Sequence, residues 1–215
     1  MAILVEYQKD WRKLFKAQSK LIGTTLGKPC REIYHIGSTA IPNVPSQPII
    51  DMLVVLKDLQ AAEQLCTLGY EHRGNGVYFL QGDGIAYQAF CTQTDDKDTF
   101  DAYIGIHNIH HAAPKTWAAQ KQAWAQQFGD DVQAYEQAKK AYFEQLAPEA
   151  REKKRRDDKL GTSLAIGMCL GMSIGTAIGA ALGNMATGMC LGVGVGMCFG
   201  IALGAGGSNQ QSKKK

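Results

Sequence analysis

The residue types that can support chemistry are concentrated between positions 34 and 55 of the 215-residue chain. A short apolar run leads into a Gly-Ser-Thr turn, a proline-rich loop and a second apolar run with one carboxylate. Backbone N–H groups and hydroxyls of such a turn can bind an anion, and a nearby aspartate can hold the Mg²⁺ that accompanies phosphates. The pattern predicts that Gly37, Ser38 and Thr39 bind phosphate. Asp51 is predicted as catalytic residue and metal ligand, and His35 as a second catalytic residue.

Each of these residues also has a structural interpretation. Ser38 and Thr39 are common as hydroxyls that cap turns. Asp51 lies in an apolar run, so it either binds a metal or ligand or is a buried carboxylate satisfied by the backbone of residues 37–40. An unpaired charge there would be costly. His35 is either functional or a hydrogen-bonded strand histidine, and these alternatives stay open.

Taken as one string, His35-Ile36-Gly37-Ser38-Thr39, then Pro42, then Pro48-Ile49-Ile50-Asp51, the segment resembles the hallmark of the GrpB family. The resemblance extends to residues 5–15, to 68–70 and more weakly to 134–143, so it covers residues 3 to about 147. It implies an α/β (α+β) nucleotidyltransferase-like fold, a mixed sheet with flanking helices. In that superfamily a Gly-Ser turn holds the triphosphate and two carboxylates on the next strand bind metals. A nucleotide or CoA-type substrate and Mg²⁺ are expected on this basis.

Three departures from the family pattern affect this expectation. Leu53 stands where the second carboxylate belongs, and one carboxylate cannot build a two-metal clamp alone. Gln47 replaces the lysine before Pro48, which removes one phosphate partner. Residues 87–90 lack the His-x-His often seen there. The chain is therefore either a transferase or a binding module that keeps a phosphate ligand without turnover.

Periodicity indicates the elements that must position these residues. A helix is expected from Asp10, as N-cap, to residue 26, another at 59–68 closed by Gly69, and two more after Pro114. Pro148 is expected to open a last helix. Histidines 110 and 111 are expected in a solvated loop, as are the aspartates near 96. The expected strands are residues 32–36, 49–56, 70–73, 77–80, 87–91 and 103–106, with a hairpin turn at 81–84.

Charge is distributed unevenly along the chain. Residues 1–150 carry 14 Lys and Arg against 17 Asp and Glu, whereas residues 151–215 carry 9 against 3. This argues against nucleic acid as a partner of the N-terminal domain, which would need a basic face. Residues 1–6 show no charged leader before a long apolar stretch, so no signal peptide and a cytoplasmic domain are expected. The six scattered cysteines are expected to be small packing residues, although the Met-Cys pairs near the C-terminus also suit a soft metal.

The composition changes abruptly at residue 160. Residues 160–207 contain no charged side chain, and glycine recurs at every fourth position in two blocks that superpose at a shift of 21 residues. The blocks are Gly167, Gly171, Gly175, Gly179, Gly183 and Gly188, Gly192, Gly196, Gly200, Gly204. Such stripes allow close helix packing, and each block is long enough to cross a bilayer.

We therefore expect four parts: a domain at 1–147, a basic juxtamembrane segment at 148–159, a transmembrane two-helix apolar hairpin at 160–207, and a basic tail at 208–215. Cations at both ends predict that both termini stay on the cytoplasmic face. Glycine zippers would also support a homo-oligomer, which leaves a third function open, a pore regulated by the N-terminal domain. The remaining alternative, a flexible linker, is disfavoured by the many Leu and Ile residues between the glycines.

Overall fold

The computed structural model describes residues 4–206 and the side chains of residues 4–204. The predictions made for residues 1–3 and for the basic tail at 208–215 lie outside these residues. The chain forms two compact units, Met1–Arg151 and Glu152–Lys215. Helix α4 begins in the first unit and continues into the second.

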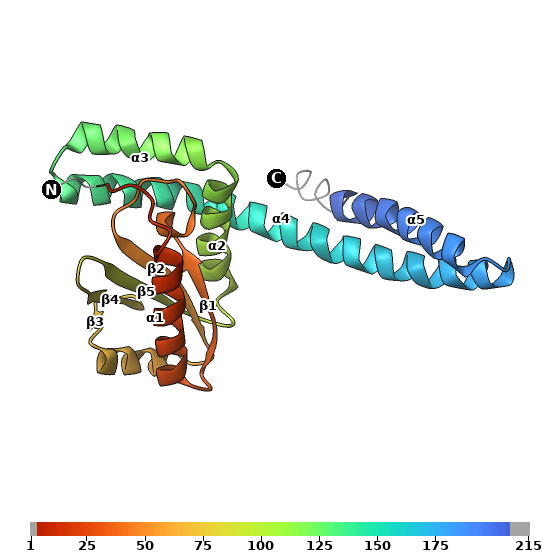
Figure 1. Ribbon diagram of the computed structural model, residues 1–215, viewed down its shortest axis with the longest axis horizontal. Coiled ribbons are helices and arrows are strands. Elements are labelled where there is room, and N and C mark those ends of the chain that lie inside the picture. The colour runs from red at the N-terminus through yellow and green to blue at the C-terminus, as the bar shows by residue number, and fades with distance from the viewer. Residues whose placement is uncertain (1–3, 207–215) are drawn as a thin grey trace, which may run out of the picture. The chain divides into compact units, whose positions relative to one another are not determined.

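A five-stranded mixed sheet forms the centre of the first unit (Figure 1). Its order is β1-β2-β5-β4-β3; β2 and β5 are parallel and the other neighbours antiparallel. The strands are β1 (Cys30–Ile36), β2 (Ile49–Leu56), β3 (Glu71–His72), β4 (Val77–Gln81) and β5 (Ala86–Gln93). The predicted mixed sheet with flanking helices is confirmed.

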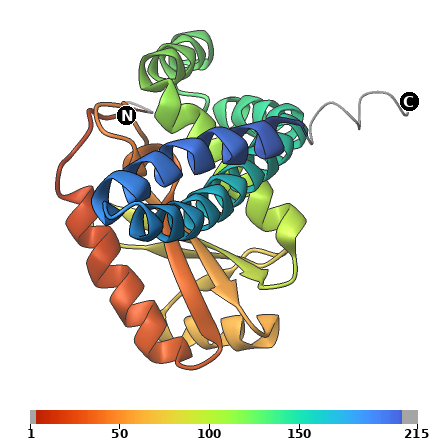
Figure 2. The same ribbon diagram turned by 90° about the vertical axis from the view of Figure 1, so that its right-hand side faces the viewer.

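Apart from Asp51, strand β2 is apolar, because helices cover both faces of the sheet. One face, with Ile50, Met52 and Val54, packs against α1 and η2 in the main core cluster. The opposite face places Leu53 and Val55 against side chains of α2. Figure 2 shows α1 and α2 on opposite sides of the sheet. Alternate residues of β2 therefore meet different cores, and Asp51 shares the face of Leu53.

Helix α1 (Trp11–Leu26) and the 3₁₀ helix η2 (Leu59–Leu68) confirm two of the expected helices. Asp10 stands before α1 but makes no side-chain cap; its carboxylate instead pairs with Lys13 at 2.8 Å. Gly69 ends η2 with φ +86°, a left-handed conformation that glycine adopts without strain. The turn at 81–84 joins β4 to β5 as predicted.

Two predictions between residues 95 and 112 are wrong. The strand expected at 103–106 lies inside helix α2 (Lys97–Ala112), because a four-residue apolar run cannot distinguish a strand from one turn of a buried helix. His110 and His111 belong to the same helix rather than to a solvated loop. His110 is buried and stacks on Trp117 with ring centroids 3.9 Å apart. Asp96 caps α2 by accepting from the Thr99 N–H.

Helices α3 (Pro114–Phe128) and α4 (Val132–Ala181) are the two predicted after residue 114. Pro148 does not open a separate helix; it lies inside α4, where its missing N–H breaks one hydrogen bond without ending the helix. A third core cluster joins α3 and the first part of α4 to the loop after β1. Its buried members are Ile41, Val44, Trp117, Trp124 and Tyr135.

The second unit contains a helical hairpin made by the later part of α4 and by α5 (Met185–Gly206). Gly183, with φ +72°, forms the turn, and Asn184 Oδ1 accepts from the Thr187 N–H. The two glycine series face each other: a Cβ added to Gly175 would lie 2.8 Å from the Cα of Gly192. The predicted two-helix apolar hairpin is confirmed as a fold.

Both helices of the hairpin satisfy the length and composition criteria for crossing a membrane. Each has a mean hydropathy of 1.8 in its most apolar window, and 17% of that window is buried. Core helices of soluble proteins can be equally long and apolar, but they are mostly buried. The low burial distinguishes these two helices from core helices.

Candidate functional site

The Gly-Ser-Thr turn follows the end of β1 and lies against Asp51 of β2. Ile36 pairs with Asp51 in the antiparallel ladder, and the next residue, Gly37, has φ +72°. A Cβ on Gly37 would lie 3.0 Å from both Cβ and Cγ of Asp51. Glycine is therefore needed twice, for its backbone conformation and for the close approach of the carboxylate. A short 3₁₀ helix, η1 (Ser38–Ala40), completes the turn.

Asp51 is an unusual carboxylate because it lies near the start of β2, an otherwise apolar strand, with mostly protein around it. Burial raises its pKa to about 6, Lys139 and Lys121 act in the opposite direction, and Glu136 adds to the rise. The side chain is half-buried, so solvent still reaches this part of the turn. A carboxyl group with this pKa can change its protonation state near neutral pH when charge is added beside it.

Two lysines from different helices approach this region. Lys121 of α3 is 2% exposed; its Nζ donates to Pro45 O at 2.6 Å and to Ser46 Oγ at 3.3 Å. Burial lowers its pKa to about 7, with a smaller contribution from the positive charge of Lys139. Lys121 thus holds the proline-rich loop in place.

Lys139 of α4 donates from Nζ to Gln47 Oε1 at 3.3 Å and pairs with Glu136 at 3.0 Å. Its side chain is 24% exposed. Helix α4 therefore places an amine beside Gln47, the position at which the family resemblance leads us to expect a lysine.

The hydroxyl of Thr39 is engaged inside the protein. It donates to Ile49 O at 3.1 Å and lies 3.1 Å from His35 Nε2. Since the hydroxyl hydrogen goes to Ile49, the hydrogen in the His35 contact must be on Nε2, and Thr39 accepts it. His35 also stacks on Phe15, and burial lowers its pKa to about 4, so it is neutral at pH 7. His35 and Thr39 brace the turn, and a catalytic role for His35 stays a prediction.

Ser38 is the hydroxyl of the turn that remains accessible. Its Oγ accepts from the indole N–H of Trp117 at 3.1 Å, which fixes the oxygen and leaves the hydroxyl hydrogen for another acceptor. Trp117 is held by His110 stacked on its ring. Ser38 is half-buried, as are Gly37 and Gln47.

The residues around Asp51 do not fit a two-metal clamp. Leu53, at the second carboxylate position, is fully buried and packs in an apolar cluster with Phe90 and Tyr103. Beside Asp51 in the sheet, β5 places Gln88. Within residues 4–206, no group of three or more His, Cys, Asp and Glu side chains could hold a metal ion. We therefore assign no chemical step to Mg²⁺, whose binding stays a prediction.

Neither lysine was assigned to the site from the sequence. Lys121 stands four residues after Trp117 and three before Trp124, and Lys139 stands four after Tyr135 and three before Tyr142. Each lysine thus interrupts an aromatic stripe at helical spacing, on the buried side of its helix. That position is a signal that could have identified them.

Replacing Asp51 with asparagine is expected to stabilise the domain at pH 7.5. The pKa of Asp51 is about 6 in the fold and 3.8 for an unperturbed aspartate, so wild-type stability falls as pH rises through this range. Asparagine carries no charge, so the variant should gain about 2 kcal/mol at pH 7.5 and nothing near pH 4. Urea unfolding at both values measures this. Asp83→Asn, in the exposed turn after β4, is the control and should show no gain; equal stability of Asp51→Asn and wild type at pH 7.5 would contradict the prediction.

Comparisons with known proteins agree with this architecture. Residues 2–149 match the sequence profile described as GrpB protein. The glutamate-rich protein GrpB of Alkalihalophilus pseudofirmus is 26% identical over 168 residues, covering 68% of this chain and 94% of that protein. YqkA of Bacillus subtilis is 28% identical over 148 residues, covering 63% of this chain but only 43% of the relative, so the chain spans less than half of that protein.

A solved structure is similar as well. The crystal structure of the conserved protein GrpB from Enterococcus faecalis has a TM-score of 0.61 and 26% sequence identity, covering 70% of this chain and 98% of that chain. The matched profile ends at residue 149, before the apolar hairpin. Since the profile covers most of the chain and the resemblance of the Gly37–Asp51 segment is confirmed, the protein belongs to the GrpB family.

Proposed function

We propose that the N-terminal domain binds the phosphate groups of a nucleotide or CoA-type ligand at the turn formed by Gly37 and Ser38. The observation that carries this proposal is the position of Lys139, whose amine donates to Gln47 of the proline-rich loop and lies close enough to Asp51, the neighbour of Gly37, to lower its pKa. A positive charge next to an accessible hydroxyl and a glycine turn is a combination suited to phosphate oxygens.

Each residue has a distinct part in the proposed binding. Ser38 donates its free hydroxyl hydrogen to a phosphate oxygen, and Lys139 leaves Glu136 to neutralise the phosphate charge. Lys121 keeps the proline-rich loop fixed through Pro45 O. Asp51 takes up a proton when the phosphate binds, because a second negative group beside its carboxylate raises its pKa further.

Binding without turnover is favoured over nucleotidyl transfer by Leu53. Its side chain is part of an apolar cluster, so the strand supplies one carboxylate where in-line phosphoryl transfer normally uses metals held by two. A transferase would release pyrophosphate from a nucleoside triphosphate, whereas a binding module leaves the ligand intact. Long incubation followed by pyrophosphate detection separates these two functions.

Calorimetric titration of the purified protein with ATP, CoA and pyrophosphate, with and without Mg²⁺, tests the proposal. We expect binding of at least one ligand, and Lys139→Gln should weaken it about 10- to 100-fold, since a charged hydrogen bond contributes roughly 1.5–3 kcal/mol. Lys140→Gln is the matched control, because Lys140 points to Glu144 at 4.0 Å and is 79% exposed. Absence of heat with every ligand, or equal losses in the two variants, would refute the proposal.

We further propose that the hairpin anchors this domain on the cytoplasmic face of a membrane, with both termini on that side. Three features support anchoring: two apolar helices of spanning length, exposed Leu and Ile side chains around them, and the basic residues that precede position 160. A pair of antiparallel helices returns the chain to the side from which it entered.

A further inference from the structure

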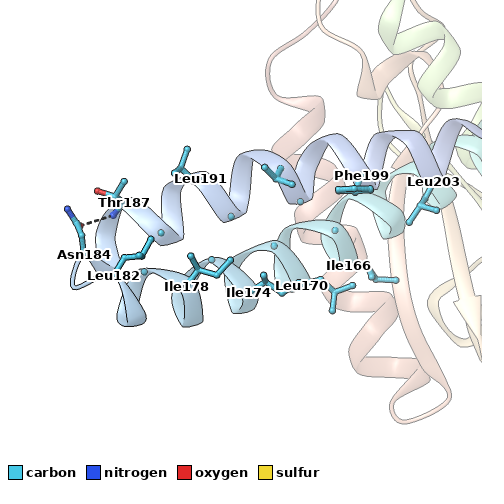
Figure 3. Close-up of a pocket in the computed structure, with 18 residues that line it drawn as sticks. Ile166, Leu170, Ile174, Ile178, Leu182, Asn184, Thr187, Leu191, Phe199 and Leu203 are labelled. Carbon is cyan, nitrogen blue, oxygen red and sulfur yellow. Dashed lines mark hydrogen bonds between the residues drawn. The ribbon is translucent and has the colours of Figure 1, made fainter.

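The hairpin carries a ridged apolar face that its own fold leaves open. A groove of about 600 Å³ runs along this face between α4 and α5 (Figure 3). The ridge on α4 is formed by Ile166, Leu170, Ile174, Ile178 and Leu182. The ridge on α5 is formed by Leu191, Val195, Phe199 and Leu203. These nine side chains are between 52% and 79% exposed.

Glycines form the floor of the groove and are already used within the hairpin. A Cβ on Gly192 would lie 2.8 Å from the Cα of Gly175, and one on Gly171 would lie 2.8 Å from the Cα of Gly196. The backbones therefore touch along this seam, and no second molecule can enter between the glycine series. An oligomer therefore cannot use the glycines to which the sequence pattern pointed.

The ridged face has approximate two-fold symmetry. At the shift of 21 residues, Leu170 corresponds to Leu191, Ile174 to Val195, Ile178 to Phe199 and Leu182 to Leu203. The symmetry also holds in space: a Cβ on Gly171 would lie 3.0 Å from the carbonyl carbon of Gly192, and the reverse distance is the same. The two-fold axis thus passes between Gly171 and Gly192, at the centre of the groove.

We infer that this face binds the same face of a second copy of the chain. An isologous interface requires a surface that is complementary to itself, and a symmetric groove between two symmetric ridges offers this, since each copy can place a ridge in the other's groove. The nine ridge side chains supply on the order of 500 Å² per copy, or about 1,000 Å² in the pair, by their apolar transfer areas. That area reaches the roughly 1,000 Å² that a specific interface needs, and inside a bilayer the association rests on the packing of ridge into groove rather than on removal from water.

Disulfide cross-linking of the full-length protein in lipid vesicles tests this inference. Five free cysteines that are exposed or partly exposed lie outside the groove and are first replaced by serine: Cys30, Cys66, Cys169, Cys190 and Cys198. Leu170→Cys then places a thiol beside the axis, and mild oxidation should convert most of the protein to covalent dimers. Met172→Cys is the matched control, because Met172 is 40% exposed on the same helix outside the groove, and it should remain monomeric.

Sedimentation in detergent gives an independent measurement without cysteines. Leu170→Ala combined with Leu191→Ala should raise the dimer dissociation constant about tenfold or more, since central anchors carry most of an interface's affinity. Met172→Ala combined with Met189→Ala truncates two side chains outside the groove and should leave it unchanged. The inference is overturned if wild type sediments as a monomer, or if Leu170→Cys and Met172→Cys cross-link equally; either result would leave the groove to lipid acyl chains.

Discussion

Replacing Gly37 with alanine is expected to lower the free energy of unfolding of the N-terminal domain by about 3 kcal/mol. Two effects act together. With φ +72° and ψ −170°, Gly37 adopts a conformation that is nearly exclusive to glycine. In addition, the new methyl group would lie 3.0 Å from Cβ and Cγ of Asp51, on a strand that is packed on both faces. Urea unfolding followed by tryptophan fluorescence measures the loss.

Substitutions at two other glycines of the same domain separate the cost of backbone strain from the cost of the steric contact with Asp51. Gly27 also has a positive φ, +58°, but a Cβ there meets nothing within 4 Å, so Gly27→Ala reports backbone strain alone. Gly23 lies inside α1 with open space around it, and Gly23→Ala should stabilise the helix by about 1 kcal/mol. If Gly37→Ala lowers the free energy of unfolding no more than Gly27→Ala does, the inference that Asp51 lies close against the turn is contradicted.

Removal of the hairpin is expected to move the protein almost completely from membranes to the soluble fraction. The full chain should pellet with membranes and resist an alkaline carbonate wash, whereas a chain ending at Lys159 retains the N-terminal core but lacks every residue of the uncharged segment. Fractionation followed by immunodetection measures the two distributions. The change in the membrane-bound fraction should be nearly complete, because both spans together hold the chain in the bilayer and the shortened chain lacks both.

A point substitution in the full chain provides a sharper version of this test. Leu170→Arg with Leu191→Arg places two charges in the apolar segment, each costing roughly 2.5–3.5 kcal/mol at the centre of a bilayer. Leu59→Arg is the control, since Leu59 is an exposed leucine, 39% accessible, of the N-terminal domain. Recovery of the unmodified chain in the soluble fraction, free of detergent, would contradict membrane anchoring.

Most elements of the fold could be predicted because local signals and burial agree. The apolar run of β2 and the glycine at position 69 each point to one structure, and both predictions are confirmed. The errors occur where local signals are ambiguous. A strand was predicted at residues 103–106 because Tyr and Ile are compatible with a strand as well as with a helix. In the fold this segment is helical, and Tyr103 and Ile104 pack from the helix onto the sheet.

The candidate site could be predicted only in part because it is assembled from distant segments. The turn and Asp51 are 14 residues apart or fewer and belong to one hairpin-like unit, so their proximity follows from the strands. Lys121 and Lys139 reach the same place from α3 and α4, and their contacts depend on how these helices pack. No local rule gives that packing. The sequence likewise gives no indication that Thr39 turns inward to Ile49.

The hydrogen bond between Trp117 and Ser38 allows ligand binding to be followed by intrinsic tryptophan fluorescence. The indole N–H donates to the hydroxyl oxygen at the centre of the proposed site, so a change at Ser38 alters the polarity felt by one of the chain's three tryptophans. The imidazole stacked on the same ring stays neutral across physiological pH, because burial lowers the pKa of His110 to about 4. Lys121 Nζ lies 5.7 Å from the centroid of that ring and has a pKa of about 7, so the emission is compared at one fixed pH. Intrinsic emission can therefore be used to screen small-molecule collections directly, with no label attached to protein or compound.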